Sequence, residues 1–495
     1  YQPSYHPIRH PDRLYIGGRW VKPSTEAMFD VVTPSTEEVG FRVAEATEAD
    51  MSSAIAAARV AFDYGPWPRL THLERAGYLR AMAAGLRARI DDIAGALPLE
   101  SGVLQSFALG SAAALPSIFE SFADLAETFP FVERHTPGPT AGGGVGLLVQ
   151  EPVGVVAAIV PWNGPAVIGA YKTSPALLAG CTVVLKMPAE APSAGYILAE
   201  VADEIGLPGG VLNVVTAGRS ASAALVRDRR IDMVSFTGSN VVGTDIATVC
   251  ADRIARVTLE LGGKSAALIL DDYDLTKAAR TITNSARLLS GQVCYGITRV
   301  IVDRARHNAF VDALSDSFGR LKVGDPFDPA SEMGPVITGR QRDRIERYIA
   351  TGQVQGARLA IGGGRPRHLD RGFYVEPTIF ADVDNRSIIA QEEIFGPVLS
   401  VIPADGEADA IAKANDTIYG LNASVFTNDV DRAYGVARRL RSGTVGHNGI
   451  RTDATIAFGG VKQSGIGREG GIEGLREYLE SKTVLLDEEP RWTSA

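Results

Sequence analysis

Three residues carry side chains suited to covalent chemistry on a carbonyl group. Cys294 lies between two glycines, Glu260 ends an apolar stretch, and Asn163 follows a Pro-Trp pair. A thiolate can attack a carbonyl carbon, a side-chain amide can stabilise the resulting oxyanion, and a carboxylate can activate water. Taken singly, a cysteine is usually a small buried hydrophobic residue, a glutamate at a strand end is usually a surface charge, and an asparagine before glycine usually forms a turn. Together the three residues suggest the hypothesis that Cys294 forms a covalent acyl intermediate.

Short apolar runs alternate with helix-like stretches after Gly154, following a mostly helical segment at 51–97. Strands that alternate with helices indicate βαβ units and a parallel sheet. The sequence therefore predicts a Rossmann-like α/β nucleotide-binding domain, in which Asn163 and Glu260 follow or end strands. We expect strands at 155–160, 182–185, 211–215, 233–236 and 257–259, and helices at 167–178, 193–205, 220–226 and 241–249.

A second α/β set follows Glu260, and two further strand-like pieces belong to neither set. The second set has expected strands at 265–270, 300–302 and 399–402, and expected helices at 307–321 and 340–350. The separate pieces are 147–151 and 483–486. Isolated strands often pair between subunits, because an open strand edge is a liability. These two pieces therefore predict a small β extension used for oligomerisation.

Two glycine motifs look like phosphate-binding loops but lack the required context. The GxGxxG motif at 465–470 has only 495 − 470 = 25 residues after it, too few for a βαβ unit, so we interpret it as a tight surface turn. The run 262–265 ends like a P-loop, but Thr258 stands where the first glycine should be. A looser candidate is the turn at 237–239, which follows a strand and opens a helix whose N–H groups favour a pyrophosphate.

Composition excludes several classes of partner. Lys plus Arg is 49 and Asp plus Glu is 58, a formal net charge of −9, which gives no electrostatic footprint for nucleic acid. No apolar run approaches the roughly 18 residues that cross a bilayer, and the first twelve residues lack a signal-peptide core. Three cysteines cannot form a disulfide framework. We expect a cytoplasmic protein that binds neither nucleic acid nor membrane and, lacking a His-Cys-Asp cluster with ligand spacing, no catalytic metal.

The joint pattern of motifs resembles the aldehyde dehydrogenase superfamily, of the NAD(P)-dependent, hydrolytic type. The motifs occur in the family's order, the separation 294 − 260 = 34 fits, and the resemblance extends from about Tyr15 to Val484. The matching motifs are Pro161-Trp162-Asn163, Phe236-Thr237-Gly238-Ser239, Glu260-Leu261-Gly262-Gly263-Lys264, Gly291-Gln292-Val293-Cys294, Glu392-Glu393-Ile394-Phe395-Gly396-Pro397 and Phe458-Gly459-Gly460.

The resemblance implies a nucleophile and three assisting residues. Cys294 would attack an aldehyde to give a thiohemiacetal, whose oxyanion the Asn163 amide and the Cys294 N–H would hold. Hydride transfer would leave a thioester, and Glu260 would activate the water that hydrolyses it. Lys172 would relay protons. The other cysteines, Cys181 and Cys250, match no catalytic motif and are expected in the core.

The cofactor implied by the resemblance is NAD or NADP. Glu393 would bind the nicotinamide ribose, Phe395 would lie against the nicotinamide end, and Lys186 would bind the adenosine ribose. The whole expected set is Ile159, Pro161, Trp162, Lys186, Gly218, Phe236, Gly238, Ser239, Gly243, Leu261, Glu393 and Phe395.

Three positions depart from the family pattern. Ala189 stands where many NAD-preferring members carry glutamate, and Glu190 comes one residue later, so we expect NAD with NADP also accepted. Ser222 replaces the second glycine of a Gly-x-x-x-Gly helix start at Gly218. Ile472 occupies the place that we match to a second carboxylate of some members, so Glu260 is the one base expected.

The substrate pocket implied by the resemblance is mainly apolar. Gly164 replaces a residue that is often aromatic, which predicts a roomy tunnel for a medium-chain, terpenoid or aromatic aldehyde. The expected lining is Gly164, Ile168, Tyr171, Leu288, Leu289, Val293, Tyr295, Asn448, Ile450 and Phe458.

The chain is expected to divide into three parts. The nucleotide-binding domain would comprise 1–127 and 150–260, the catalytic domain 261–477, and the oligomerisation extension 128–149 and 478–495. An extension made of two pieces implies a homodimer or a homotetramer.

The leading function is the oxidation of an aldehyde to a carboxylic acid, and other classes stay open. Cys294 could perform acyl transfer or thioester hydrolysis without redox chemistry, although the nucleotide half of the chain argues against it. CoA-acylating dehydrogenases usually lack the glutamate that corresponds to Glu260. A non-catalytic protein on this fold would have no need of Cys294, Glu260 and Asn163 together.

Overall fold

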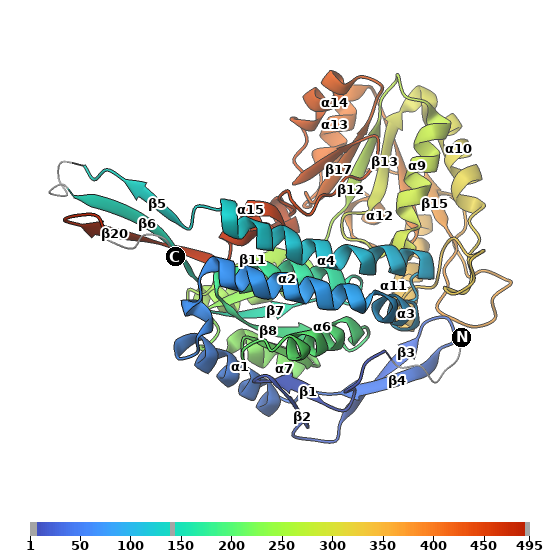
Figure 1. Ribbon diagram of the computed structural model, residues 1–495. Helices are drawn as coiled ribbons and strands as arrows, with labels where there is room; N and C mark the ends of the chain where they lie inside the picture. Colours follow the sequence, from blue (N-terminus) through green and yellow to red (C-terminus); the bar gives the residue numbers. More distant parts are fainter. Residues whose placement is uncertain (1–6, 139–143, 491–495) are drawn as a thin grey trace.

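The computed structural model describes residues 7–138 and 144–490. Two large β-sheets, each covered by helices, form the body, and a slender β-arm projects from it (Figure 1). The predicted class is confirmed: a Rossmann-like parallel sheet, a second α/β unit and a small β extension. Within the described residues, no helix is both long enough and apolar enough to pass through a lipid bilayer.

The first sheet is built from the apolar runs that the sequence predicted. Read from β9, its parallel strands lie in the order β9-β8-β7-β10-β11. Numbered along the chain from β7 as strand 1, this is the 3-2-1-4-5 order of doubly wound sheets. Each predicted strand and helix is present, with ends that differ by a few residues. The strands are β7 (Val155–Ile159), β8 (Thr182–Met187), β9 (Leu212–Thr216), β10 (Met233–Thr237) and β11 (Arg256–Glu260), joined by α5 (Pro165–Ala179), α6 (Ser193–Glu204), α7 (Arg219–Arg227) and α8 (Asn240–Asp252).

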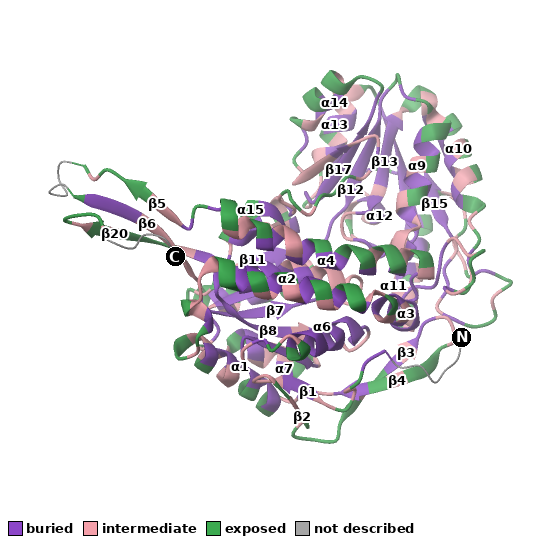
Figure 2. Ribbon diagram, in the orientation of Figure 1, coloured by how far each residue is buried: buried purple, intermediate pink, exposed green. Residues whose placement is uncertain are grey.

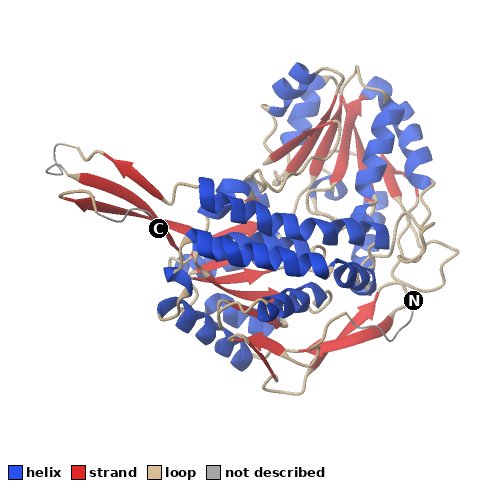
Figure 3. Cartoon of the chain, in the orientation of Figure 1, coloured by secondary structure: helices blue, strands red, loops and turns tan. Residues whose placement is uncertain are grey.

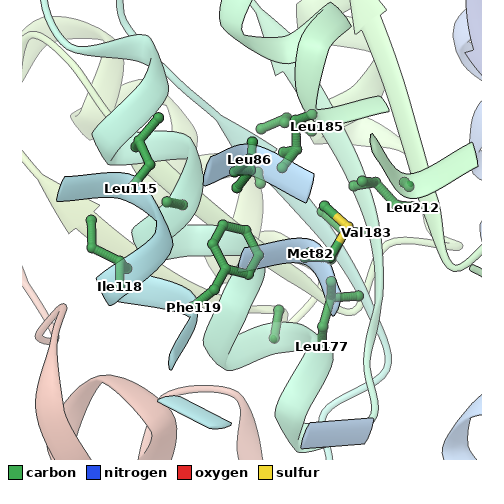
Figure 4. Packing of buried hydrophobic residues seen from close by; sticks show 14 of the residues in the cluster. Met82, Leu86, Leu115, Ile118, Phe119, Leu177, Val183, Leu185 and Leu212 are labelled. Carbon is green, nitrogen blue, oxygen red and sulfur yellow. The ribbon is translucent and has the colours of Figure 1, made fainter. Parts of the chain in front are cut away.

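Alternate residues of these strands enter two separate cores, because successive side chains of a strand point to opposite faces. Val183 and Leu185 pack with Met82 and Phe119 from the helices on one face (Figure 4). Val184 belongs to the core on the other face. Apart from Lys186 of β8 and Arg256 and Val257 at the start of β11, the residues of these strands are accordingly buried (Figure 2). The covering helices are α2 (His72–Ala88), α3 (Ile90–Ser101), α4 (Gln105–Thr128), α5 and α6 on the first face, and α1 (Glu48–Asp63), α7 and α8 on the second.

Several elements at the edges of the first sheet were not predicted. The antiparallel β1 (Leu14–Ile16) and β2 (Arg19–Val21) extend it beyond β9, and β3 (Met28–Thr33) pairs with β4 (Glu38–Ala44) in a separate hairpin. On the opposite edge, β19 (Gly465–Ile466) pairs with β11, with Gly465 opposite Glu260. The interpretation of the GxGxxG motif as a tight surface turn was therefore wrong, because its first two residues form an edge strand.

The second sheet is parallel except at one edge. Its strand order is β14-β15-β16-β13-β12-β17-β18, and β14 is the antiparallel member. Figure 3 shows helices on both of its faces. The elements are β12 (Ser265–Ile269), α9 (Leu275–Ala286), β13 (Ile297–Asp303), α10 (His307–Gly319), α11 (Gly339–Val354), β14 (Arg358–Ile361), β15 (Thr378–Ala381), α12 (Ile388–Gln391), β16 (Val398–Ala404), α13 (Glu407–Asn415), β17 (Asn422–Phe426), α14 (Val430–Ala437) and β18 (Thr444–His447).

The arm joins strands that are far apart in the sequence. β6 (Val145–Pro152) lies between β5 (Val132–His135) and β20 (Leu479–Leu486), and both pairings are antiparallel. The predicted pieces 147–151 and 483–486 thus pair with each other within one chain. Before reaching β20, the chain returns from the second sheet through β19 and α15 (Gly471–Arg476), and α15 packs against α4 and α5. This return brings residues near 465–476 back to the first sheet.

Candidate active site

The carboxyl ends of the first sheet bring several predicted cofactor residues into one row. Ile159 pairs with Lys186 on one side and with Phe236 on the other. One residue further along, Thr237 pairs with Glu260. Nucleotides bind beside the carboxyl ends of doubly wound sheets, at the point where the strand order reverses. That point here lies between β7 and β10, so the register gathers the predicted residues at the expected place.

Other predicted cofactor residues shape the surroundings of this row. Ser239 caps α8 by accepting from Val242 N at 3.5 Å, and Gly218 is the N-terminal cap residue of α7. Gly243 has to be small, because a Cβ there would lie 2.6 Å from Leu261 Cδ2. Burial lowers the pKa of Lys186, and the carboxylate of Glu190 opposes that shift.

The second sheet contributes the predicted nicotinamide end. Glu393 is held by Gly263 N, which donates to its Oε1 at 3.0 Å, and the Phe395 ring lies edge-on to Trp162 with 5.3 Å between centroids. Thr237 Oγ1 is buried with no hydrogen-bond partner among the described residues. A buried hydroxyl left in this way needs a partner, and because Thr237 lines the same cavity as Glu260, a ligand that reaches this cavity can supply one. Residues of the first sheet's strand ends, with Glu393 and Phe395 from the second α/β unit, therefore fit a dinucleotide bound beside the carboxyl ends of the first sheet.

Cys294 follows a turn that is anchored on several sides. The Asn163 Nδ2 group donates to Gln292 O at 3.0 Å, so the predicted amide lies beside the cysteine turn. A Cβ at Gly263 would lie 2.4 Å from Cys294 O, and a Cβ at Gly291 would lie 2.2 Å from Gly396 O. The glycines of these motifs are therefore required by close backbone approach. The thiol itself is partly buried, whereas Cys181 and Cys250 are core residues, as predicted.

Glu260 is a buried carboxylate without a fixed partner. It is 5% exposed, and neither of its oxygens has a hydrogen-bond partner among the described residues. A Cβ at Gly459 would lie 2.6 Å from Glu260 Oε1, so the Phe-Gly-Gly motif leaves the space that the carboxylate occupies. An unpartnered buried carboxylate that faces a cavity is available to water or substrate.

A second carboxylate, which the sequence reasoning missed, lies in the same site. Lys172 Nζ contacts Glu469 Oε1 at 2.7 Å and donates to Ser235 Oγ at 3.1 Å. The expectation that Ile472 marks the absence of such a group was wrong, because the Gly-Arg-Glu run itself ends in Glu469. The Gly467-Arg468-Glu469 run could have indicated this carboxylate, but it was interpreted only as part of the GxGxxG motif at 465–470.

Burial and neighbouring charges shift the pKa values of the reacting groups upward. Burial first, and then the carboxylates of Glu393 and Glu260, raise the pKa of the Cys294 thiol above its usual value. Burial first, and then Glu469, raise the pKa of Glu260, while Lys172 and Arg468 oppose the shift. The resting thiol is therefore protonated near neutral pH, and Glu260 titrates above the range of an ordinary carboxylate.

Cys294, Asn163 and Glu260 line one cavity of about 200 Å³. Of the predicted substrate residues, Leu288, Asn448 and Ile450 lie outside this lining. The Asn448 amide is occupied by both backbone groups of Thr427, at 3.0 and 3.1 Å. The predicted residues that do line the cavity are Gly164, Ile168, Tyr171, Leu289, Val293, Tyr295 and Phe458.

Part of the cavity wall comes from elements that sequence reasoning did not connect with the site. Ser101 from α3 and Phe107 and Ser111 from α4 line it, together with Leu97 and Val103. No motif marks these positions, because α4 is an ordinary amphipathic helix whose approach to Cys294 is set by packing. The segment 452–453 also contributes, through exposed side chains at the cavity mouth.

Comparisons with known proteins agree with this geometry. Residues 20–484 match the aldehyde dehydrogenase family. The chain is 43% identical to a geranial dehydrogenase of Castellaniella defragrans, over 96% of this chain and 98% of that protein. A Mycobacterium tuberculosis aldehyde dehydrogenase in complex with NAD+ superposes with a TM-score of 0.93 at 46% identity, covering 96% of this chain and 98% of that one.

A Pseudomonas syringae aldehyde dehydrogenase C mutant, solved with NAD+ and octanal, also has a TM-score of 0.93, at 37% identity and over 97% and 98% of the two chains. The NAD+ of these complexes agrees with the predicted cofactor. A catalytic constellation predicted from motifs, strand ends that fit a dinucleotide and these matches lead to one conclusion. This chain belongs to the aldehyde dehydrogenase family and is an oxidoreductase that acts on aldehydes.

Proposed function

We propose that this enzyme oxidises an apolar aldehyde to the carboxylic acid with NAD, and accepts NADP as well, through a thioester on Cys294. The observation that carries the proposal is one cavity lined by Cys294, Asn163 and Glu260 and walled by apolar side chains. A nucleophile, an oxyanion donor and an unpartnered base facing one space are the groups that aldehyde oxidation by covalent catalysis requires.

The first step is addition of the Cys294 sulfur to the aldehyde carbon. The thiol loses its proton to a base, a C–S bond forms, and the carbonyl π electrons move to oxygen. Water in the cavity takes this proton and passes it to solvent, so that Glu260 stays deprotonated and available for the hydrolysis step. The Asn163 amide, fixed by one N–H to Gln292 O, has its second N–H to offer the oxyanion together with the Cys294 N–H.

The second step needs an acceptor for the hydride on the former aldehyde carbon, which NAD supplies when bound. Glu393 and Lys186 would hold the two riboses, and Trp162 and Phe395 would confine the nicotinamide end. The chain's part is to keep water away from the cysteine until the thioester has formed. Glu260 then removes a proton from water as the water attacks the thioester, and the thiolate of Cys294 leaves and is reprotonated.

An apolar substrate is favoured by the wall of the cavity. Val167, Ile168, Leu289, Val293 and Phe458 face it, and Gly164 leaves room beside Asn163. Burying apolar substrate surface against such a wall contributes about 25 cal/mol per Å². The names of two relatives, a geranial dehydrogenase and an enzyme solved with octanal, point in the same direction.

The test is a panel of aldehydes followed by absorbance at 340 nm with NAD. The panel contains geranial, octanal, benzaldehyde, betaine aldehyde and succinic semialdehyde. We expect kcat/KM for the three apolar aldehydes to exceed that for the two charged ones by at least about tenfold, or about 1.4 kcal/mol. Equal or reversed preference rejects the substrate class. Hydrolysis of a separately added acyl thioester, with no change at 340 nm for any aldehyde of the panel, would instead support the non-redox alternative.

The arm supports a homo-oligomer. β5 and β20 are the outer strands of the arm, and each has one edge that no strand of the described residues pairs with; such edges pair readily with another chain. We therefore propose a homodimer or a homotetramer in which the arm contacts a second copy. Light scattering coupled to gel filtration measures the mass, and a monomer at micromolar concentration would exclude this proposal.

A further inference from the structure

The chain reaches Cys294 through a left-handed turn. Leu289 has φ 48° and ψ 29°, Ser290 has φ 54° and ψ 39°, and Gly291 has φ 77°. Left-handed dihedral angles are uncommon for residues with a β-carbon, because Cβ crowds the following carbonyl oxygen. Two consecutive non-glycine residues in this region are strained, and surrounding contacts must hold them there.

Ser290 makes the contact that holds the turn. The residue is 3% exposed, and its hydroxyl donates to Gly334 O at 2.7 Å, with Pro335 O a further acceptor at 3.2 Å. The segment that carries these acceptors packs closely against the end of α3, since a Cβ on Gly334 would lie 2.2 Å from Gly102 O. The hydroxyl therefore hydrogen-bonds the turn to a backbone segment that itself packs closely against the end of α3.

A second tie connects the same segment with the residue after the turn. Ile337 N donates to the Gln292 side-chain Oε1 at 3.1 Å, and Gln292 N closes the turn on Leu289 O at 3.0 Å. Gln292 O in turn accepts from Asn163. Ser290 and Gln292, on either side of Gly291, thus both hydrogen-bond to the backbone of segment 334–337. Cys294 follows two residues after Gln292.

The turn also decides which leucine faces the substrate. Leu289 lines the cavity, whereas Leu288 does not. A right-handed continuation of the helical turn would rotate both side chains, so the arrangement of the cavity wall depends on the same strained backbone.

We propose that Ser290 is a positioning residue for Cys294: its hydroxyl holds the left-handed turn and so fixes how the thiol enters the cavity. The inference rests on the proposed role of Cys294 as nucleophile. Ser290 does not touch substrate in this role and acts only through the backbone that leads to the cysteine.

The test compares Ser290→Ala with Ser290→Gly in the full-length enzyme. Both remove the hydroxyl, but glycine adopts left-handed angles without strain whereas alanine does not. Ser400→Ala is the matched control, because Ser400 is a buried serine of β16 whose hydroxyl donates to Ile389 O at 3.2 Å, and it is absent from the cavity lining. The rate of Cys294 alkylation by iodoacetamide is measured by intact mass at a series of pH values. The dependence of this rate on pH gives the thiol pKa, and its limit at high pH gives the rate constant of the thiolate.

We expect Ser290→Ala to lower the thiolate alkylation rate constant and kcat by about tenfold, the effect of losing one well-made buried hydrogen bond. Ser290→Gly should lose clearly less, and Ser400→Ala should keep both values even where its Tm falls. Dissociation constants for NAD, measured by fluorescence quenching, should stay within about twofold of wild type.

Two results would overturn the proposal. One is wild-type alkylation and kcat in Ser290→Ala. The other is an equal loss in the alanine and glycine variants, which would mean that the hydroxyl supports general stability and not the left-handed turn. Failure of the nucleophile assignment is separate, because it would show as retained activity in Cys294→Ala whatever the Ser290 variants do.

Discussion

Lys172 Nζ and Glu469 Oε1 lie 2.7 Å apart although 297 residues separate them in the chain. Both residues are buried, Lys172 fully and Glu469 to 8% exposure. Removing one partner from a buried pair leaves an uncompensated charge, which is strongly destabilising. The pair lies beside Glu260, whose pKa Glu469 raises and Lys172 lowers. The two charges therefore set the basicity of the proposed catalytic carboxylate in opposite directions.

Opposite pH shifts are expected from the two members of this pair. Glu260 acts as a base only when deprotonated, so turnover should rise with pH as its raised pKa is passed. Glu469→Gln removes a negative neighbour, lowers the pKa of Glu260 and should move the acidic limb of kcat to lower pH. Lys172→Met removes a positive neighbour and should move that limb to higher pH.

The measurement is kcat against pH at saturating aldehyde and NAD. Glu473→Gln is the control, because Glu473 is an exposed carboxylate of α15. Acidic limbs that coincide in all variants would contradict the electrostatic coupling. If Lys172→Met does not fold, the Glu469→Gln profile still decides the question.

Cys294→Ala should abolish dehydrogenase activity, since the variant lacks the sulfur that forms the thioester. Cys181→Ala and Cys250→Ala should retain most activity, because both thiols belong to apolar cores. Steady-state rates at 340 nm compare the three variants. Full turnover in Cys294→Ala, or inactive but well-folded Cys181→Ala, would refute the assignment of the nucleophile.

Glu260→Gln should separate hydride transfer from hydrolysis. The variant keeps size and hydrogen bonding but removes the base, and general-base assistance is typically worth about 10²–10⁴-fold, so turnover should fall by that order. If acylation proceeds without Glu260, a burst of reduced cofactor near one per active site survives and an acyl mass appears on the protein. Loss of the burst would instead show that Glu260 is needed earlier, to deprotonate Cys294.

Cofactor choice should follow the residues after β8. Ala189 places no carboxylate three residues beyond Lys186, and Glu190 faces Arg340, with 3.5 Å between Arg340 Nη2 and Glu190 Oε1. We expect NAD to be preferred with measurable NADP use, and Ala189→Glu to reduce NADP use by charge repulsion. The measurement is kcat/KM for each cofactor at one saturating aldehyde. An NADP preference above about tenfold, or about 1.4 kcal/mol, would reverse this expectation.

Much of the fold could be predicted because it depends on local patterns. The apolar runs of β7 to β11 are short and β-branched and alternate with helical stretches, so their type and their parallel sheet follow from burial on both faces. The catalytic motifs could be found for a similar reason, since Gly263, Gly291 and Gly459 must be glycine where backbone or carboxylate approaches closely. Such steric requirements fix glycine at these positions, so that the motifs can be recognised in the sequence.

Some of the missed elements have weak local signals, although β3 and β4, of six and seven residues, are of ordinary strand length. β1 and β2 are three residues each, and β19 has two, so neither length nor periodicity marks them. α4 contains Pro116 and extends over Gln105–Thr128, beyond the helical segment predicted at 51–97. Its contribution to the cavity through Phe107 and Ser111 depends on how it packs across the first sheet.

The sequence by itself determined the family, the nucleophile motif and the order of the first-sheet strands along the chain. Only the tertiary structure decided which charged groups share the site. Glu469 reaches Lys172 because the chain returns from the second sheet through β19, and no local pattern encodes a contact across 297 residues. Leu289 and not Leu288 enters the cavity because a left-handed turn, held by Ser290, overrides ordinary backbone preference. Both outcomes come from packing between distant segments, which supplies the energy that local sequence does not.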